Sequence, residues 1–300
     1  MSTSVAVRVR DGSASLLLAG VLWGTGGLAG SILVTRASLH PLSVAAYRLL
    51  LGGVLAVLFL WSSGGLRAIP RTRPVARRLL LAGGLLAVFQ SCYFAAVVLT
   101  SVSVATMTTI GSVPVLVAVA SAVAERRLPS LPTVLSILAA LLGLALLTWS
   151  PGGTQDRWRL LGGLACALAA GAGFAALTLA TRRQVAGLDP LRTTAFGCLV
   201  GGLALLPVAV WLGMALPLRV DVLGVAAYLG AVPTALAYLS YFRGLRTAHP
   251  VVAALAALLE PLTAAVLAAV LLGDRLGVPG WCGAGLLIGA LAVSYRRSER

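Results

Sequence analysis

One carboxylate is set apart from the other acidic residues by its surroundings. Glu260 lies about ten residues into an apolar stretch over 250–272, which at about 1.5 Å per residue places it near the middle of a bilayer. An ionised, unpaired carboxylate costs several kcal/mol there, so Glu260 must be protonated, paired or in a wet cavity. Two interpretations stay open: a cavity carboxylate that exchanges protons or binds a cationic group, and a structural carboxylate that bonds to a neighbouring helix.

A single arginine is buried in a similar way in the first half of the chain. Arg48 lies about seven residues into the apolar stretch 42–62, or about 10 Å below the nearer surface. Its side chain can snorkel to the interface, pair with a carboxylate or face an anionic group of a ligand. A structural role is favoured, and a pairing with Glu260 is a hypothesis that the sequence alone does not establish.

Two prolines interrupt apolar stretches at matching depths. Pro261 directly follows Glu260, and Pro114 lies at the same depth in the stretch 103–123. A proline inside a helix frees the carbonyl four residues earlier, here Ala257 and Ile110, and tends to kink the helix. The sequence therefore predicts helix breaks at Pro114 and Pro261, although proline also occurs in membrane helices for packing alone.

Polar and aromatic side chains at helical spacing mark further candidates for the lining of a cavity. For any single aromatic residue, packing or anchoring at the lipid interface is the alternative, and membrane Ser and Thr often bond within their own helix. The predicted cavity residues are Trp23, Tyr47, Arg48, Gln90, Tyr93, Thr109, Ser112, Phe174, Tyr238, Tyr241 and Glu260. No catalytic residue, metal ligand or cofactor site is predicted.

The elements that must position these residues are membrane helices. The chain is 59% hydrophobic, its mean hydropathy is +1.00 and only 10% of its residues are charged, which is incompatible with a soluble globule of this size. Apolar stretches of spanning length cover 14–34, 42–62, 79–99, 103–123, 131–150, 160–180, 191–212, 222–242, 250–272 and 278–295. We therefore predict an all-α integral membrane protein with ten transmembrane helices, because helices satisfy their own backbone groups in lipid.

The distribution of charge predicts the orientation in the membrane. All 23 basic residues are arginine, and the net charge is +15. With a cytoplasmic N-terminus, 17 of them fall on the cytoplasmic side, Arg48 lies inside a span, and five fall on the other side: Arg36, Arg157, Arg159, Arg219 and Arg275. This asymmetry follows the positive-inside rule, so both termini are expected in the cytoplasm of a multi-pass protein of the cell membrane. Because the bilayer explains the charge, nucleic acid is not an expected partner.

The second half of the chain repeats the first at an offset of 147–149 residues. Pro41, Tyr47 and Gly52 recur as Pro190, Phe196 and Gly201, and Pro114 recurs as Pro261. The two Tyr-Phe dipeptides of the chain, Tyr93-Phe94 and Tyr241-Phe242, also correspond. Five spans per copy is an odd number, so the second copy must enter the membrane upside down. Inverted repeats of this kind are typical of secondary transporters, and we divide the chain into five-helix repeats at 1–152 and 153–300.

Short motifs in both repeats carry a family resemblance. They are Leu22-Trp23-Gly24, Tyr47-Arg48, Pro114-Val115 followed by Glu125, and Leu259-Glu260-Pro261 followed by Gly273-Asp274-Arg275-Leu276. With these motifs the chain resembles the drug/metabolite transporter superfamily, in particular proteins with two EamA-type domains. Asp274 stands where the family usually has Glu, which puts the role of the acidic helix ends in doubt. The resemblance implies a ten-helix carrier with a central cavity that exports metabolites, amino acids or toxic compounds.

The expected function is secondary transport of a small molecule by alternating access, with Glu260 as the candidate proton-coupling residue. The alternatives are an intramembrane enzyme and a channel. Clustered acids, HExxH, G-x-S-x-G and Walker motifs are missing from the sequence, and no repeated filter or charged ring is evident. Gly-x-x-x-Gly motifs indicate close packing inside the bundle, with a homodimer as the alternative to a monomer. The sequence does not identify the substrate.

Overall fold

The computed structural model describes residues 2–68, 70, 72–100, 102–147, 157–271 and 277–298, and every regular element in these ranges is helical. The elements are α1 (Ser2–Ala37), α2 (Pro41–Ser62), the short 3₁₀ helix η1 (Gly65–Ala68), α3 (Arg73–Leu99), α4 (Val102–Glu125), α5 (Leu131–Leu147), α6 (Arg157–Arg182), α7 (Pro190–Trp211), α8 (Val220–Gly230), the π-helix η2 (Ala231–Leu236), α9 (Ala237–Gly244), α10 (Pro250–Ala256), α11 (Leu259–Leu271) and α12 (Val278–Ser298). Gly273, Asp274, Arg275 and Leu276 of the predicted motifs lie outside the described residues.

These elements form ten rods, one over each predicted span, because α8, η2 and α9 are continuous and α10 continues into α11. Eight rods are long and apolar enough to cross a bilayer, and α5 and α12 are shorter apolar helices. The predicted fold class, an all-α membrane protein of ten helices, is confirmed. The apolar stretches predicted the helices well because about 20 apolar residues in lipid leave few alternatives to a helix.

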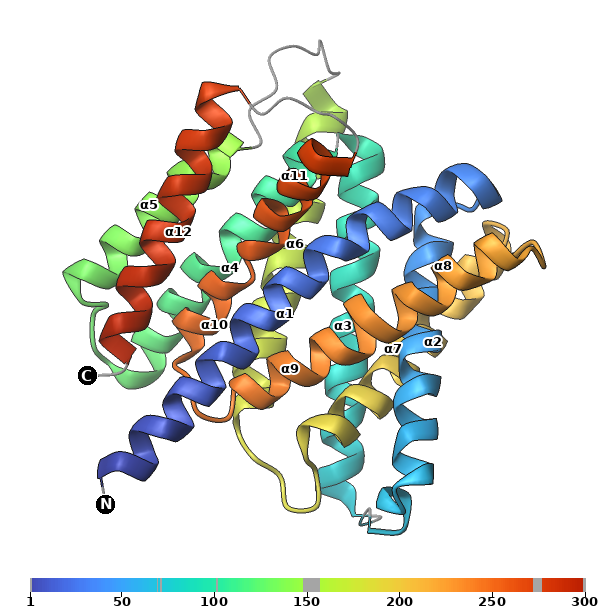
Figure 1. Ribbon diagram of the computed structural model, residues 1–300, viewed down its shortest axis with the longest axis horizontal. Helices are drawn as coiled ribbons and strands as arrows, with labels where there is room; N and C mark the ends of the chain where they lie inside the picture. Colours follow the sequence, from blue (N-terminus) through green and yellow to red (C-terminus); the bar gives the residue numbers. More distant parts are fainter. Residues whose placement is uncertain are drawn as a thin grey trace.

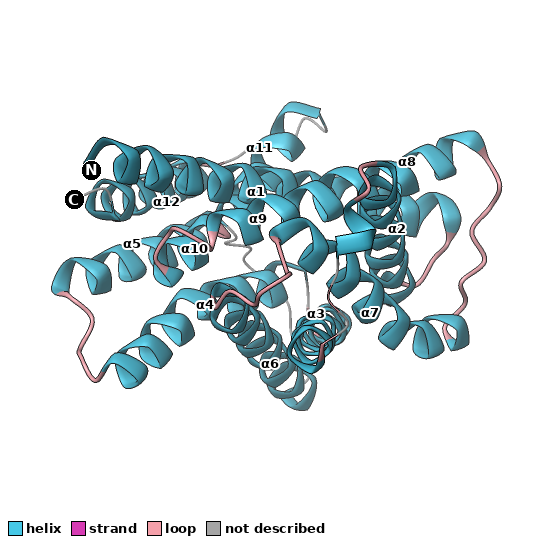
Figure 2. Ribbon diagram, turned by 90° about the horizontal axis from the view of Figure 1, so that it is seen from below, coloured by secondary structure: helices cyan, strands magenta, loops and turns pink. Residues whose placement is uncertain are grey.

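The rods pack as two four-rod bundles and a separate pair (Figure 1). In the bundle that we call bundle A, α1 and α2 pack against α8–η2–α9, and α1 also packs along α10 and α11. In bundle B, α3 packs against α6 and α7, and α4 packs against α6. The bundles meet along α2 and α7. Helices α5 and α12 pack on each other and touch the remaining rods less, and they lie together at one edge in both views (Figures 1 and 2).

This packing follows the internal repeat. Exchanging each rod for its counterpart, for example α3 for α8–α9 and α6 for α1, turns the contacts of bundle B into those of bundle A. The pairs α2–α7 and α5–α12 join counterparts directly, as elements on a two-fold axis must. The first repeat starts at the end of the molecule that holds both termini, and the second repeat starts at the other end (Figure 1). Each bundle therefore mixes helices of both repeats.

The arginines divide between the two ends of the rods. We call the end with both termini and the loops after α2, α4, α6 and α9 the terminal face, and the other end the opposite face (Figure 1). Among the described residues at rod ends, the terminal face holds Arg73, Arg77, Arg78, Arg126, Arg127, Arg182, Arg183, Arg192, Arg243 and Arg246, and the opposite face holds Arg36, Arg157, Arg159 and Arg219. The alternation on which the orientation argument depends is therefore present in the fold.

The predicted pair of proline breaks is not symmetric. Helix α4 runs without interruption through Pro114, so the break expected there is not observed. The counterpart rod is interrupted at Ala257 and Leu258, directly before the first turn of α11, which contains Glu260 and Pro261. There the Ala257 carbonyl accepts the Glu260 N–H at 3.0 Å, a bond over three residues in place of the four-residue helical bond. A membrane helix can contain a proline without a break when surrounding groups satisfy the freed backbone carbonyl, and α4 continues through Pro114.

Glycines on α1 bring that helix close to the interruption. A Cβ atom added to Gly20 would stand 2.3 Å from the Ala256 carbonyl oxygen, and one on Gly24 would stand 2.4 Å from Cβ of Thr263. Such distances are far below ordinary contact, so only glycine allows α1 to lie directly on α10 and α11. The Gly20-x-x-x-Gly24 motif thus acts inside the molecule, which holds the broken rod in place.

Candidate functional site

A pocket lies between the two bundles at the depth of the predicted cavity. Its lining is Trp23, Arg48, Phe89, Gln90, Tyr93, Thr106, Ile110, Phe174, Tyr238, Ala257 and Glu260. Helices α1, α2, α9 and α11 of bundle A and the interruption between α10 and α11 contribute five of these residues, and α3, α4 and α6 of bundle B contribute six. Seven residues predicted from the sequence therefore meet at one place: Trp23, Arg48, Gln90, Tyr93, Phe174, Tyr238 and Glu260.

The pocket is nearly closed. Its volume of about 30 Å³ has room for about two water molecules, given that one needs roughly 10–15 Å³. Two partly exposed lining residues, Tyr93 and Thr106, lie within two turns of the ends of α3 and α4 at the opposite face. Phe174 and Tyr238, on the side of the terminal face, are 3% and 1% exposed. The pocket is thus sealed more firmly toward the terminal face.

Five aromatic rings form that seal, and we call them the aromatic floor: Trp23, Phe89, Phe174, Tyr238 and Tyr241. The Trp23 ring lies 5.3 Å from the ring of Tyr238 and 5.0 Å from that of Tyr241, and Phe174 lies 5.1 Å from Phe89. Tilted and edge-on contacts at such distances are favourable for aromatic rings. The floor joins helices of both bundles, so it must rearrange if the bundles separate on this side.

One hydrogen bond ties the floor across the bundles. The Thr178 hydroxyl on α6 donates to the Phe174 carbonyl at 2.9 Å, so the Tyr241 hydroxyl on α9 is the donor in its 2.6 Å contact with Thr178 Oγ1. Both side chains are fully buried. A buried hydrogen bond between mobile units acts as a latch, because separation leaves both hydroxyls unpaired until water reaches them. We call this bond the latch.

The guanidinium of Arg48 is held by the π-helix η2. Its Nη2 atom donates to the Pro233 carbonyl and its Nε atom to the Thr234 hydroxyl, each at 3.3 Å. The Thr234 hydroxyl in turn donates to the Leu229 carbonyl at 2.7 Å. A π-turn leaves a carbonyl without its helical partner, and π-turns are frequent at functional sites. Arg48 donates to the carbonyl and hydroxyl groups of this π-turn, so a structural contact of the kind expected from the sequence is present, although Arg48 also lines the pocket.

Glu260 lies in the first turn of α11, where the helix dipole favours a negative charge. Within the described residues its carboxylate accepts no hydrogen bond and forms no ion pair with Arg48 shorter than 4.0 Å. The two charges nevertheless line one small pocket, so they attract each other at longer range. The sequence raised the hypothesis that Glu260 pairs with Arg48. In this conformation the two residues line the same pocket but do not form a close ion pair.

Four predicted residues lie outside this lining. Tyr47 donates through its hydroxyl to the Met214 carbonyl at 2.5 Å, and Thr109 donates to the Ala167 carbonyl at 3.1 Å. Ser112 donates to the Thr109 carbonyl at 2.8 Å and packs against α6. Tyr241 belongs to the aromatic floor beneath the pocket. For the first three residues, the structure shows the packing and backbone bonding that were the alternatives to a cavity role.

Four lining residues are not among the eleven predicted cavity residues: Phe89, Thr106, Ile110 and Ala257. Of these, Ala257 lies on the same stripe of small and polar residues in the ninth span as Glu260. Thr106 and Ile110 belong to a stripe of α4 that is rotated by about one residue from the predicted stripe with Thr109 and Ser112. Thr106 shares a 2.8 Å hydrogen bond with Tyr93. Phe89 precedes Gln90, and an apolar residue in an apolar helix carries no sequence signal of its own. The small Ala257 marks the interruption of the ninth rod.

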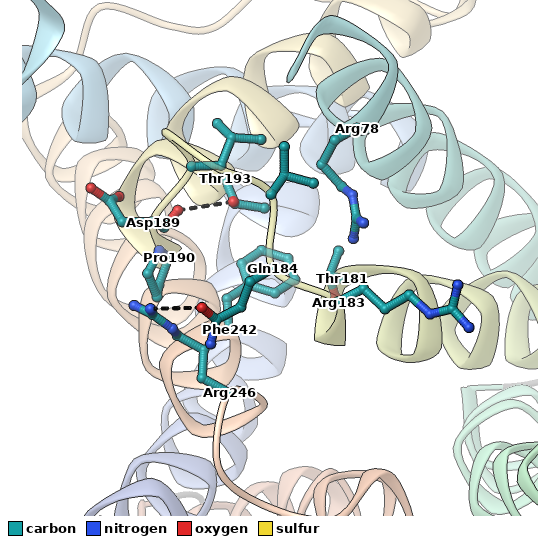
Figure 3. A pocket seen from close by; sticks show the side chains of 11 residues that line it. Arg78, Thr181, Arg183, Gln184, Asp189, Pro190, Thr193, Phe242 and Arg246 are labelled. Atoms are coloured by element: carbon teal, nitrogen blue, oxygen red, sulfur yellow. Dashed lines mark hydrogen bonds between the residues drawn. The ribbon is translucent and has the colours of Figure 1, made fainter. Parts of the chain in front are cut away.

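A second cleft of about 30 Å³ lies at the terminal face (Figure 3), on the other side of the aromatic floor from the central pocket. Its lining includes Arg78, Arg183, Arg246, Asp189 and Phe242, and Arg246 donates to Gln184 Oε1 at 3.4 Å. Phe242 lines this basic cleft and stacks on Tyr238 of the aromatic floor, with 5.9 Å between the ring centres. The two rings therefore separate the basic cleft from the central pocket. The two clefts therefore lie on either side of one seal.

Two larger clefts of about 340 and 310 Å³ lie among α5, α10 and α12 and among α1, α8 and α11. Neither contains an Arg, Asp or Glu side chain, and the second is almost wholly apolar. Among the residues that the structure describes, no group of three or more His, Cys, Asp or Glu side chains is arranged to hold a metal ion. The central pocket is therefore the candidate site for recognition of a polar solute.

Known proteins are similar to this chain over almost its full length. The sequence model of the EamA-like transporter family matches twice, over residues 11–149 and 161–296. The uncharacterized transporter YwfM of Bacillus subtilis (strain 168) is 29% identical over 281 residues, which is 93% of this chain and 92% of YwfM. The uncharacterized inner membrane transporter YicL of Salmonella typhimurium (strain LT2) is 27% identical over 297 residues, which is 97% of each chain.

A solved crystal structure superposes with a TM-score of 0.82 over 96% of this chain and 98% of its own, at 19% identity, and shares the fold. The double family match covers most of the chain, and both named relatives are called transporters. The chain thus belongs to the EamA-like transporter family and is a membrane transporter of the drug/metabolite type with two EamA repeats, not an enzyme.

Proposed function

We propose that this protein is a proton-coupled secondary transporter that exports small metabolites, amino acids or toxic compounds across the cell membrane by alternating access. Both termini, and with them the terminal face, lie in the cytoplasm in this proposal, in accord with the excess of arginine there. The observation that carries the proposal is the pocket itself. It contains two opposite charges at membrane depth, Arg48 and Glu260, and it lies between two bundles related by an inverted repeat.

The packing indicates which parts move. The sequence repeats are interleaved, so bundles A and B, and not the two halves of the chain, are the natural rigid units. Their shared surface contains the pocket, the aromatic floor and the latch between Thr178 and Tyr241. Separation of the bundles at the terminal face breaks the latch and connects the basic cleft with the pocket, and separation at the opposite face widens the mouth near Tyr93 and Thr106.

A pocket of about 30 Å³ is too small for a metabolite, since ligand sites usually measure about 300–1,000 Å³. The conformation described here is thus a closed form with weaker closure toward the opposite face. Binding of a solute requires the bundles to move apart. The solute therefore shifts the population toward the conformation that can bind it. Closure around the solute then expels water and strengthens its interactions with the charged groups.

Glu260 is the proposed coupling residue. Its carboxylate faces the pocket without a protein hydrogen bond or close ion pair in the described part of the chain, so solvent and solute that enter the pocket reach it directly. The interrupted backbone at Ala257 and Leu258 lets the segment around Glu260 shift with little cost in helical hydrogen bonds. Release of a proton on one side and its uptake on the other would couple the two open forms to a proton gradient.

The test uses the purified full chain in liposomes, screened for counterflow of amino acids, amines and toxic compounds. For each transported solute, an imposed pH gradient should drive accumulation by the natural protein. Glu260→Gln should retain counterflow when the solute is saturating and should lose accumulation driven by the gradient. Glu125→Gln, at an exposed helix end on the terminal face, is the matched control and should behave like the natural protein. Unchanged accumulation by Glu260→Gln would remove Glu260 from the coupling role.

A further inference from the structure

Two buried N–H donors in the central pocket have no partner. They are Nε1 of Trp23 and Nε2 of Gln90, in side chains that are only 4% and 2% exposed. The hydroxyl of Tyr238 approaches the Gln90 amide, but the amide nitrogen stays unpaired. An unsatisfied buried donor is costly and rare in a folded protein. Both side chains line the pocket, so a solute or water inside it is their available partner.

The donors come from different bundles. Trp23 lies on α1 of bundle A and Gln90 on α3 of bundle B, so a single acceptor group between them would bridge the bundles. Arg48 adds a positive charge to the same pocket. Its Nε and Nη2 atoms bind η2, which leaves the N–H groups of Nη1 available. Three side chains of the pocket thus offer N–H groups, the arrangement that a carboxylate requires.

The complementary group in the pocket is the Glu260 carboxylate. It is the acidic residue of the lining, and it accepts no hydrogen bond from the described residues. A positively charged N–H group of a solute is its natural partner. The formal charges of Arg48 and Glu260 cancel, so the pocket as a whole carries no net charge to attract a singly charged ion. The remaining lining is apolar and includes Phe89, Ile110 and Phe174.

We infer that the pocket binds a small zwitterion, with its carboxylate at Trp23, Gln90 and Arg48, its ammonium at Glu260 and an apolar side chain against Phe89 and Phe174. This inference rests on the proposed function, because it assigns the substrate class of the same site. A solute with only one charge would leave either Glu260 or the N–H donors buried without a partner. Unpaired buried groups of this kind reduce affinity strongly, which makes the pocket selective for solutes with both charges.

The test compares solutes that differ only in charge. Leucine, 3-methylbutylamine and 4-methylpentanoate have the same apolar group with both charges, the positive charge alone and the negative charge alone. Phenylalanine, phenethylamine and 3-phenylpropionate repeat the series with a larger group. Binding to the full chain in lipid nanodiscs is measured by equilibrium dialysis. In each series that shows binding, the zwitterion should bind tenfold or more tightly than either of its analogues.

Three variants assign the charges to residues. Trp23→Phe keeps the ring and removes only the N–H donor, so it should weaken binding of the zwitterion and the carboxylate about fivefold to tenfold, as expected for one hydrogen bond of about 1–1.4 kcal/mol. It should leave binding of the amine unchanged. Glu260→Gln should weaken binding of the zwitterion and the amine and spare the carboxylate. Trp61→Phe, on a ring that is 71% exposed, is the matched control and should change none of the affinities.

The zwitterion assignment would be overturned if an amine or a carboxylate bound as tightly as the zwitterion of its series, or if no member of either series bound. It would also be overturned if Trp23→Phe weakened the amine and the carboxylate equally, because that pattern reports a distorted pocket and not a lost donor. Accumulation of a different class of solute in the liposome assay would leave the proposed transport function intact. Failure of every solute in the liposome assay would instead contradict the proposed function.

Discussion

Helix α4 and the rod α10–α11 occupy equivalent places in the two repeats, yet only one of them is broken. Both rods contain a proline at equivalent positions, Pro114 and Pro261. In α4 the residue before the proline is the fully buried, apolar Val113, and the helix continues. In the other rod that residue is Glu260, and the backbone is interrupted just before it. Proline alone therefore does not set the break.

The rods α3 and α8–η2–α9 differ in the same sense. Helix α3 is regular over Arg73–Leu99, whereas its counterpart contains the π-helix Ala231–Leu236, with Pro233 in it. In both cases the irregular copy belongs to the second repeat and to bundle A. Irregular backbone inside a membrane is tolerated where it is buried in protein or lines a cavity, and both interruptions lie beside the pocket. The comparison indicates that bundle A carries the charged groups and bundle B supplies much of the apolar wall.

Removal of the two prolines should have different consequences for stability, and this is the largest expected difference between the repeats. Pro114→Ala restores a donor for the Ile110 carbonyl inside a regular helix, so it should stabilise the protein, by up to about 3 kcal/mol. Pro261 lies in the first turn of α11, where the N–H groups have no helical partner, so Pro261→Ala should change stability little. Apparent melting temperatures in detergent measure both effects. Equal shifts in the two variants would contradict the asymmetry.

The next largest effect should come from a glycine beside η2. A Cβ atom at Gly52 would stand 2.7 Å from Thr234 Cγ2 and 2.9 Å from the Gly230 carbonyl oxygen. At the equivalent Gly201 the closest atom would be the Gly83 carbonyl oxygen, at 3.0 Å. Gly52→Ala should therefore destabilise the protein by about 1–3 kcal/mol, and Gly201→Ala by less, because the added methyl group at Gly52 would come closer to its neighbours, including the Gly230 carbonyl oxygen of the backbone. A larger decrease in melting temperature for Gly201→Ala than for Gly52→Ala would contradict this prediction.

A smaller effect concerns the start of the broken rod. His249 Nδ1 accepts the Val251 N–H at 3.3 Å and caps α10, which requires this nitrogen to be unprotonated. Burial and, secondarily, the charge of Arg182 lower the pKa of His249 below its usual value, against an opposing effect of Glu125. Because the folded-state pKa is lowered, the full stability is present above the unfolded value of about 6.5 and is lost as the pH falls toward the folded pKa.

His249→Asn keeps a capping side chain that does not titrate over this range. Between pH 7.5 and 5.5, the melting temperature of the natural protein should decrease more than that of the variant. The matched variant is His40→Asn, because His40 caps α2 in the same way through a 3.2 Å bond from the Leu42 N–H. An identical pH dependence of His249→Asn and the natural protein would show that the cap does not titrate in this range.

The sequence predicted those features of the fold that depend on composition alone. Ten long apolar stretches give ten helices in lipid, and a charge such as Glu260 or Arg48 in such a stretch is conspicuous. The rotation of a helix about its axis is much harder to infer when nearly every residue is apolar. For this reason Thr109 and Ser112 were placed in the cavity, and Thr106 and Ile110 were missed. The π-turn was not predicted either, because an apolar sequence gives little indication of it. Its contact with Arg48 joins residues that are 185 positions apart in the chain, Arg48 and Pro233.

The central claim is that one pocket opens alternately to the two faces of the membrane by separation of bundles A and B. Ile110 is 3% exposed and lines this pocket, so Ile110→Cys in a background without the four native cysteines is a direct reporter. A membrane-impermeant thiol reagent, added to either side of sealed vesicles of known orientation, should label this cysteine from both faces. Tyr241→Phe removes the latch and should raise the labelling rate from the terminal face several-fold, with a smaller change from the opposite face. Labelling from one face only, in both the latch-intact and the Tyr241→Phe protein, would contradict alternating access through this pocket.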